Sequence, residues 1–136
     1  MNVNQILLEL MVVDVDQTID FYEQVLGFEL LLSEQENGST YWAKMRKGAF
    51  TLTFKEEGRL KNELVFLKNQ PVGGSVAICL LVDDLEGYHQ MVKDTCDMLD
   101  HPHITPCGST QFSMLDNNGY ILTFERFQSK NPNVAH

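Results

Sequence analysis

The sequence of 136 residues is long enough for one compact domain or for two small half-domains that share a core. Its hydrophobic content of 43% is ordinary for a globular protein, and no segment approaches the ~18 consecutive apolar residues that would span a bilayer. A formal net charge of −9 argues against a nucleic-acid partner, because phosphate binding needs clustered lysine and arginine. The same charge favours a cationic ligand, although it can also serve only to keep the protein in solution.

The cysteines and the N-terminus indicate the compartment. Cys79, Cys96 and Cys107 are odd in number and form no CxxC motif, which argues against a disulfide framework and for a reducing environment. The N-terminus lacks a basic region, and Glu9 interrupts the first apolar run, so we expect no signal peptide. These features together predict a cytoplasmic protein with no membrane partner.

The first half of the chain predicts a strand, a helix and three further strands. The apolar run over residues 6–13 is typical of a strand, and Asp14 with Gln17 has the spacing of a helix capping box. Gly27 follows the amphipathic segment as a helix-ending glycine. The remaining strands are expected at residues 28–33, 39–46 and 49–55.

The second half predicts the same order less clearly. A strand is expected at 75–82, followed by a helix capped by Asp83 with Glu86. Pro102 weakens the next strand, at 101–106, which we therefore place at a sheet edge. The last two strands are expected at residues 111–115 and 120–127.

An internal repeat supports this division into two halves. Val12-Val13-Asp14 recurs as Val82-Asp83-Asp84, and Leu52-Thr53-Phe54 recurs 70 positions later as Leu122-Thr123-Phe124. We therefore expect an α+β fold of two βαβββ modules that form a curved mixed sheet around a cavity. The modules would occupy residues 1–57 and 75–127, with a linker at 58–74 and a flexible tail at 128–136. Part of the linker should pack down through Leu60, Leu64, Phe66 and Leu67.

Two motifs resemble a known family. Asp14 is followed by Phe21-Tyr22 and by Leu26-Gly27-Phe28, and the second module carries Gly108, Gln111-Phe112, Asp116 and Gly119-Tyr120 at fixed spacing. This pattern resembles the vicinal oxygen chelate superfamily, which includes glyoxalase I, extradiol dioxygenases and bleomycin-resistance proteins. The resemblance covers about nine-tenths of the chain and implies the glyoxalase/bleomycin resistance fold. The chain departs from the usual Asp-Pro-x-Gly closing turn, because Asn117 replaces the proline.

The resemblance also implies where a metal would bind. Metal-dependent members take one ligand from each of four equivalent strands, usually histidine, glutamine or glutamate. The matching positions here are Leu7, Thr53, Ala77 and Thr123. None of them is a plausible primary ligand for a divalent ion, so we expect neither a metal nor any other cofactor. His101 and His103 could chelate, but they fall on a poor edge strand, and an exposed role is favoured.

Strand alternation predicts which residues line the ligand side of the sheets. The candidate ligand-binding residues are Glu9, Met11, Trp42, Thr51, Thr53, Cys79, Phe112, Thr123 and Glu125. The hairpin register should place Trp42 opposite Thr53, with Trp42 and Phe112 as aromatic walls. A carboxylate at Glu9 is costly to bury alone, so it needs Lys44 or Arg46, cavity water or a cationic ligand. A Glu9–Lys44 pair with Trp42 as core filler is equally well supported.

No catalytic residue can be assigned. Cys79 has no basic neighbour in the sequence, and the role of a small buried hydrophobe is favoured for it. Cys107 lies in a loop without an assigned task, and His89 falls on the polar side of the second helix, where we expect it to be solvated.

Three functions compete. The leading hypothesis is a metal-free protein that sequesters a small organic ligand, cationic or aromatic, similar to the bleomycin-resistance type, in which two subunits together line each cavity. A homodimer is therefore expected. The rival is an enzyme, either a diverged glyoxalase-type lyase or isomerase or a dioxygenase, with a non-standard metal site. The third is a structural or regulatory domain without a ligand.

Overall fold

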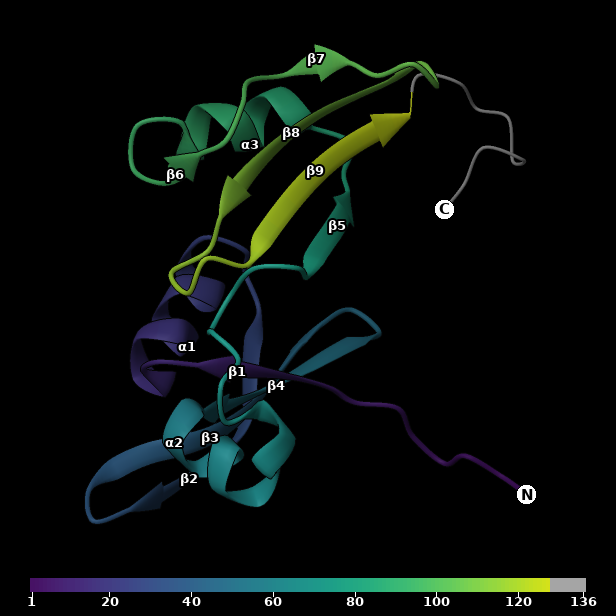
Figure 1. Ribbon diagram of the computed structural model, residues 1–136. Coiled ribbons are helices and arrows are strands. Elements are labelled where there is room, and N and C mark those ends of the chain that lie inside the picture. Colours follow the sequence, from purple (N-terminus) through teal and green to yellow (C-terminus); the bar gives the residue numbers. More distant parts are fainter. Residues whose placement is uncertain (128–136) are drawn as a thin grey trace. The chain divides into compact units, whose positions relative to one another are not determined.

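The computed structural model describes residues 1–127 and divides the chain into two compact units, Met1–Gly73 (unit 1) and Gly74–His136 (unit 2) (Figure 1). The tail expected at 128–136 lies outside the described residues. Each unit contains its own mixed sheet. None of the helices within residues 1–127 combines the length and apolarity needed to cross a bilayer.

Unit 1 contains one four-stranded sheet, with strands in the order β1-β4-β3-β2. The first and fourth strands run parallel, and the other neighbours are antiparallel. The elements are β1 (Leu8–Val12), α1 (Val15–Gln24), β2 (Glu29–Glu36), β3 (Ser39–Lys47), β4 (Phe50–Glu56), α2 (Glu57–Glu63) and the 3-10 helix η1 (Val65–Leu67).

The core of unit 1 lies between α1 and one face of this sheet. The helix begins as predicted, because an oxygen of the Asp14 carboxylate accepts a hydrogen bond from the Gln17 N–H at 2.9 Å. Tyr22 is fully buried, with its ring centroid 4.8 Å from that of Phe54 and 5.4 Å from that of Phe28. The helix ends at a left-handed glycine, Gly27, with φ 71°. The sheet residues that complete this core are Leu10, Val12, Ala43, Met45, Leu52 and Phe54.

Unit 2 repeats the arrangement with a shorter helix and a divided strand. Its elements are β5 (Ala77–Leu81), α3 (Leu85–Val92), β6 (Asp97–Met98), β7 (His103–Ile104), β8 (Ser109–Leu115) and β9 (Ile121–Phe127). The sheet order is β5-β9-β8, and β6 and β7 both pair with β8. The strand expected at 101–106 therefore shrinks to the two residues of β7, because prolines at 102 and 106 remove backbone donors.

The two units share one strand register. Leu8 pairs with Leu52 in unit 1, and Ile78 pairs with Leu122 in unit 2, each 70 positions later. This agreement confirms the α+β class and the repeated module. The cap of α3 lies one residue later than predicted, because the carboxylate that accepts from Gly87 N, at 3.0 Å, belongs to Asp84 and not Asp83.

The segment expected as a linker, 58–74, contains most of α2 and all of η1. A carboxylate oxygen of Glu56 accepts the Gly58 N–H at 2.5 Å and caps α2, and Leu60 is 4% exposed. The packing predicted for Leu64 and Phe66 is wrong, since they are 48% and 89% exposed. The turn of α2 that carries Leu60 therefore packs into the core of unit 1.

Candidate ligand-binding site

The sheet face of unit 1 opposite the α1 core carries a mixed set of polar and aromatic side chains, which we call the polar face. Its residues are Glu9, Met11, Trp42, Lys44, Thr51, Thr53 and Lys55. Glu9 pairs with Thr53, which in turn pairs with Lys44 on the next strand. The adjacent row places Met11, Lys55 and Trp42 side by side. Thr53 and Met11 are buried, and the other members are half-buried or exposed.

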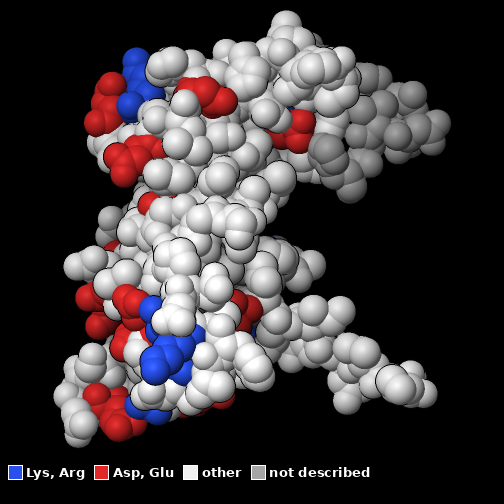
Figure 2. Space-filling model, in the orientation of Figure 1, with Lys and Arg blue, Asp and Glu red and all other residues white. Residues whose placement is uncertain are grey.

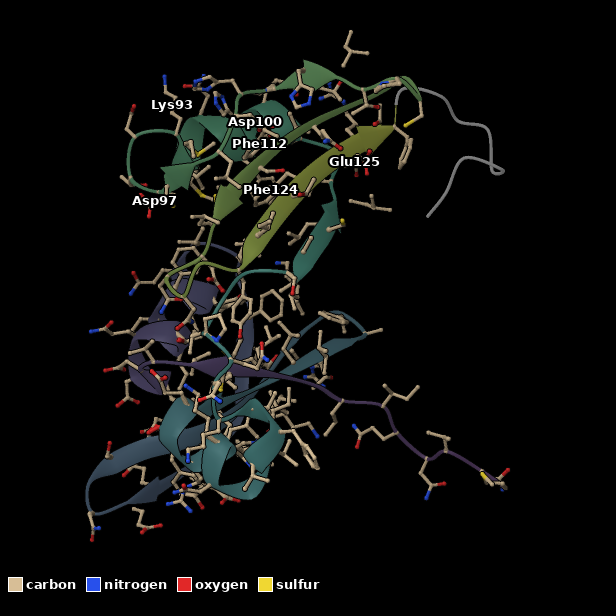
Figure 3. All side chains as sticks on the ribbon, in the orientation of Figure 1. Lys93, Asp97, Asp100, Phe112, Phe124 and Glu125 are labelled. Atoms are coloured by element: carbon tan, nitrogen blue, oxygen red, sulfur yellow. The ribbon has the colours of Figure 1, made fainter. Side chains whose placement is uncertain are left out.

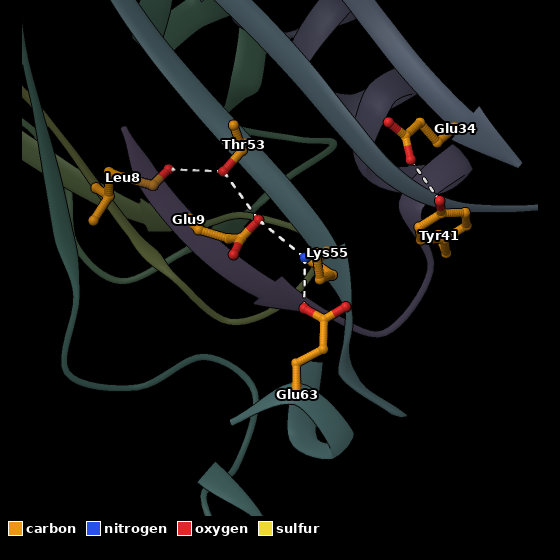
Figure 4. Close-up of polar contacts among 7 residues, drawn as sticks. All are labelled: Leu8, Glu9, Glu34, Tyr41, Thr53, Lys55 and Glu63. Carbon is orange, nitrogen blue, oxygen red and sulfur yellow. Dashed lines mark hydrogen bonds and ion pairs between the residues drawn. The ribbon is translucent and has the colours of Figure 1, made fainter. Parts of the chain in front are cut away.

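A chain of polar contacts runs along this face (Figure 4). The Thr53 hydroxyl lies 3.4 Å from the Leu8 carbonyl oxygen and 3.4 Å from Oε1 of Glu9. That same Glu9 oxygen lies 3.9 Å from Nζ of Lys55, which forms a much closer pair with Glu63 at 2.7 Å. Both contacts of Glu9 are long, and its side chain is 33% exposed, so its carboxylate keeps capacity to accept further hydrogen bonds.

The partner of Glu9 differs from the prediction. Lys55 approaches it, whereas Arg46 pairs with Glu29 at 3.3 Å. Lys44 forms no ion pair within residues 1–127. The predicted Glu9–Lys44 pair is therefore absent from the described residues, and a half-buried ammonium group and a half-exposed carboxylate flank Thr53.

The predicted hairpin register is wrong by two residues. Trp42 lies opposite Lys55, and Lys44 lies opposite Thr53, because Gly48 and Ala49 form a two-residue turn between Lys47 and Phe50. A shift of two residues preserves the side of the sheet to which a side chain points. Trp42 therefore remains on the same face as Thr53, where its ring is half-buried.

The corresponding face of unit 2 has different chemistry. Cys79 pairs with Thr123, whose hydroxyl lies 2.8 Å from that of Ser113. Cys79 is exposed, which contradicts its expected role as a buried hydrophobe. Glu125, labelled in Figure 3, is only 6% exposed. Its carboxylate accepts a hydrogen bond of 2.6 Å from the Ser109 hydroxyl. That carboxylate is engaged within the unit, unlike the loosely held carboxylate of Glu9.

Phe112 does not belong to this site. It is 0% exposed and stacks on Phe124 with ring centroids 4.8 Å apart, on the core side of β8 and β9. The internal repeat is out of step by one residue at this strand. Ala43 pairs with Phe54, and Phe112 pairs with Phe124. Ala43 and Phe112 are therefore equivalent but lie 69 positions apart, whereas the two L-T-F elements lie 70 apart. A change of one residue moves a side chain to the other face. His89, expected to be solvated, packs its ring against Phe112 at 5.3 Å between centroids.

Cys107, which precedes β8, lies next to two hydroxyl groups. Its sulfur lies 3.1 Å from the Thr105 hydroxyl and 3.8 Å from the Ser109 hydroxyl. Hydrogen bonding from Thr105, and then from Ser109, lowers the pKa of this exposed thiol. The sequence indicated a loop cysteine, but not these hydroxyl neighbours.

A groove of about 710 Å³ in unit 1 was not predicted. Its lining residues are Glu36, Asn37, Ser39, Thr40, Tyr41, Glu56, Gly58, Arg59, Asn62 and Glu63. The Arg59 guanidinium stacks 3.6 Å from the Tyr41 ring centroid and pairs with Glu36, which raises the pKa of the guanidinium. On the face drawn in Figure 2, basic side chains likewise lie next to acidic ones. The groove depends on α2, which lies in the segment expected as a linker, so no signal in the sequence indicated it.

The polar side chains that line the groove are largely engaged with other groups of unit 1. Glu56 caps α2, Glu63 pairs with Lys55, and the Tyr41 hydroxyl bonds to Glu34 at 2.5 Å (Figure 4). The hydrogen bond to Glu34 raises the pKa of the Tyr41 phenol. Through Glu63 the groove adjoins the polar face, which retains the more available carboxylate.

The donor set does not fit the metal site that the family resemblance implies. Leu7 and Ala77 offer no ligand atom, and the two threonines offer only neutral hydroxyls. Their strand neighbours add one carboxylate, Glu9, and one thiol, Cys79. Among residues 1–127, no group of three or more histidine, cysteine, aspartate or glutamate side chains is arranged to hold a metal ion.

Comparisons with known proteins give a consistent picture. Residues 3–124 match the model of the Glyoxalase/Bleomycin resistance protein/Dioxygenase superfamily. TioX from Micromonospora sp. ML1 is similar in structure, with 20% identity, a TM-score of 0.69, and coverage of 91% of this chain and 98% of TioX. A glyoxalase/bleomycin resistance protein/dioxygenase family enzyme from Burkholderia phytofirmans PsJN has 14% identity and a TM-score of 0.74, and 88% and 95% of the two chains are covered.

A third solved structure, from the mobile metagenome of V. Pseudocholerae, has 22% identity, a TM-score of 0.65 and coverage of 95% and 98%. No curated protein matches the chain. At these identities, the solved structures support the fold alone.

Proposed function

The chain belongs to the Glyoxalase/Bleomycin resistance protein/Dioxygenase superfamily, and from this premise we propose that it binds a small organic molecule on the polar face of unit 1 without using a metal ion. The observation that carries the proposal is the carboxylate of Glu9, which lies on a half-polar sheet face with contacts no closer than 3.4 Å. A carboxylate held so loosely can accept hydrogen bonds from a ligand at little cost to the fold.

Trp42 supplies the second element of recognition. Its half-buried indole stands two strands away from Glu9, with β4 between them. Two strand spacings of about 4.8 Å and an offset of two residues along the strands separate the two backbone positions by roughly 12 Å. A planar aromatic group on Trp42 joined to a cationic group near Glu9 matches this spacing.

The chemistry of the family's metal positions supports binding in place of catalysis. Leu7, Thr53, Ala77 and Thr123 provide no primary ligand for a divalent ion, and the residues found beside them do not replace one. Sequestration requires only complementary shape and a few polar anchors, which the polar face offers.

The chain's single tryptophan makes the binding experiment direct. Fluorescence titration with planar aromatic ammonium compounds should change the Trp42 emission, whereas matched aromatic carboxylates should not. In calorimetric titrations, Glu9→Gln should weaken binding of the ammonium compound by about 1–3 kcal/mol, the range of a charge-assisted hydrogen bond. Trp42→Ala should weaken it through lost stacking.

Lys44→Gln is the matched control, because it neutralises the cation on the other side of Thr53. It should leave binding of the ammonium compound unchanged or slightly stronger. Tight binding of the carboxylates, abolished by Lys44→Gln and unaffected by Glu9→Gln, would reverse the proposed sign of the site. An activity on a small organic substrate that a chelator abolishes and an added divalent metal ion restores would contradict a metal-free function.

A further inference from the structure

Two histidines of unit 2 lie close together in an arrangement that the sequence does not reveal. His89 belongs to α3, and His101 belongs to the segment between β6 and β7. Nε2 of His89 lies 3.5 Å from Nδ1 of His101, and the rings stand almost perpendicular, at 88°. Both imidazoles are at least partly exposed, so an ion can reach them.

His89 is held in position by the core beneath it. Its ring packs edge-on against Phe112, which is 0% exposed and stacked on Phe124. The helix that carries it is fixed at its N-terminus by Asp84, whose carboxylate accepts the Gly87 N–H. The orientation of this imidazole therefore depends on buried aromatic contacts of unit 2.

The segment that carries His101 is fastened to β8. The Leu99 N–H donates to the Ser113 carbonyl at 2.9 Å, and the Ser113 N–H donates to Asp100 at 2.7 Å. Nδ1 of His103 lies 2.8 Å from the His101 carbonyl oxygen, to which it can only donate. Hydrogen bonds on both sides of His101 therefore restrict its backbone before any ion arrives.

We propose that His89 and His101 form a two-imidazole site for a borderline divalent metal ion such as Zn²⁺ or Ni²⁺. The two nitrogens are 3.5 Å apart. An ion about 2.1 Å from each would form a nitrogen–ion–nitrogen angle of about 110°, close to tetrahedral. Imidazole is a preferred ligand of both ions. The described residues offer no group of three protein ligands, so water or an external molecule must complete the coordination.

This site is separate from the family's metal positions. Those positions are Leu7, Thr53, Ala77 and Thr123, whereas the histidine pair joins α3 to the segment before β7. Two carboxylates, Asp97 and Asp100, and one cation, Lys93, are also found around this part of unit 2 (Figure 3). Because Lys93 follows His89 by one helical turn, it opposes a bound cation, and Lys93→Gln should strengthen binding.

The test is a titration of the full chain, without an affinity tag, with Ni²⁺ and separately with Zn²⁺. One ion per chain should bind, and His89→Ala and His101→Ala should each weaken binding at least about tenfold. His103→Gln is the matched control, because it removes the neighbouring imidazole and retains a side-chain N–H that can donate to the His101 carbonyl oxygen. The metal affinity of this variant should stay within about twofold of that of the unaltered chain. Binding should also weaken as the pH falls, since a ligating imidazole must be unprotonated.

Nitrogen-detected NMR of the unaltered chain provides a measurement that does not depend on how the variants fold. Added metal should shift the ¹⁵N resonances of Nε2 of His89 and Nδ1 of His101 together, and should leave the ring-nitrogen resonances of His103 unchanged. Equal loss of binding in His103→Gln, retained affinity in the His89 and His101 variants, or dissociation constants above the millimolar range would each overturn the proposal.

Discussion

Cys107 shows how a few hydroxyl groups set the reactivity of a single side chain. Hydrogen bonds from Thr105 and Ser109 lower the pKa of its thiol, and the sulfur is exposed to reagents. We therefore predict that Thr105→Val, which removes the closer hydroxyl, moves the alkylation of Cys107 to higher pH. The sign follows because the lost donor stabilised the thiolate, so more alkaline solution is needed to form it.

Iodoacetamide labelling followed by peptide mass spectrometry over a range of pH would measure this change. Cys79, exposed in the same unit but far from Thr105 in sequence, is the internal control, and its labelling profile should be the same in both proteins. An unchanged Cys107 profile in Thr105→Val would mean that the 3.1 Å contact does not influence the thiol.

At the scale of single elements, the start of α3 provides a clean comparison between adjacent aspartates. Asp84 accepts the Gly87 N–H, whereas Asp83 is outside the cap. We predict that Asp84→Ala destabilises the protein by about 1 kcal/mol, the usual value of an N-cap, and that Asp83→Ala changes stability by less than about 0.5 kcal/mol. Urea unfolding of both variants would measure the difference, and equal effects would contradict the capping role of Asp84.

Strands and helices whose signals are local could be predicted from the sequence. The capping carboxylate of α1 and the left-handed Gly27 define the first helix, and the L-T-F elements define the register of β4 and β9. Each of these signals operates over a few residues and needs no knowledge of distant contacts.

Features that depend on an accumulated residue count could not be predicted reliably. Five residues lie between the paired residues Leu115 and Ile121 of β8 and β9, whereas two lie between the paired residues of the hairpin in unit 1. The spacing of equivalent strand residues therefore changes from 70 to 69, and the Phe112 side chain points into the core. The length of the turn between β3 and β4 was unknown in the same way, so the predicted strand partner of Trp42 was wrong by two residues. The partner of Glu9 does not follow from that displacement, because the observed register places Lys44 in the row of Glu9 and Thr53, yet Lys55 on β4 approaches the carboxylate.

Residues 1–127 contain one arrangement of strands and helix twice, with different side chains on the two sheet faces. In unit 1 the row around the central threonine contains Glu9 and Lys44, whereas in unit 2 the equivalent strand residue beside Thr123 is Cys79. The buried carboxylate of Glu125 is already bonded to Ser109. Both units therefore share the register, whereas the loosely held carboxylate lies in unit 1 and the corresponding carboxylate of unit 2 is engaged.

The edge strands β1 and β5 can influence whether chains associate with one another. Within the sheets formed by residues 1–127, β1 pairs on one side only, and so does β5. Both strands expose an apolar side chain, Leu8 at 44% and Leu81 at 51%. Unpaired edges that carry apolar residues associate readily with other strands, and natural proteins prevent this with charged residues placed on the edge.

We therefore predict a homodimer at tens of micromolar, with twice the chain mass of 15.5 kDa by light scattering. The double substitution Leu8→Lys and Leu81→Lys should shift the mass toward that of one chain, because it places charge on both edges. Val65→Lys adds a similar charge at a position that is 64% exposed in η1, away from either sheet edge, and should leave the dimer intact. A single-chain mass for the unaltered protein would contradict the predicted dimer.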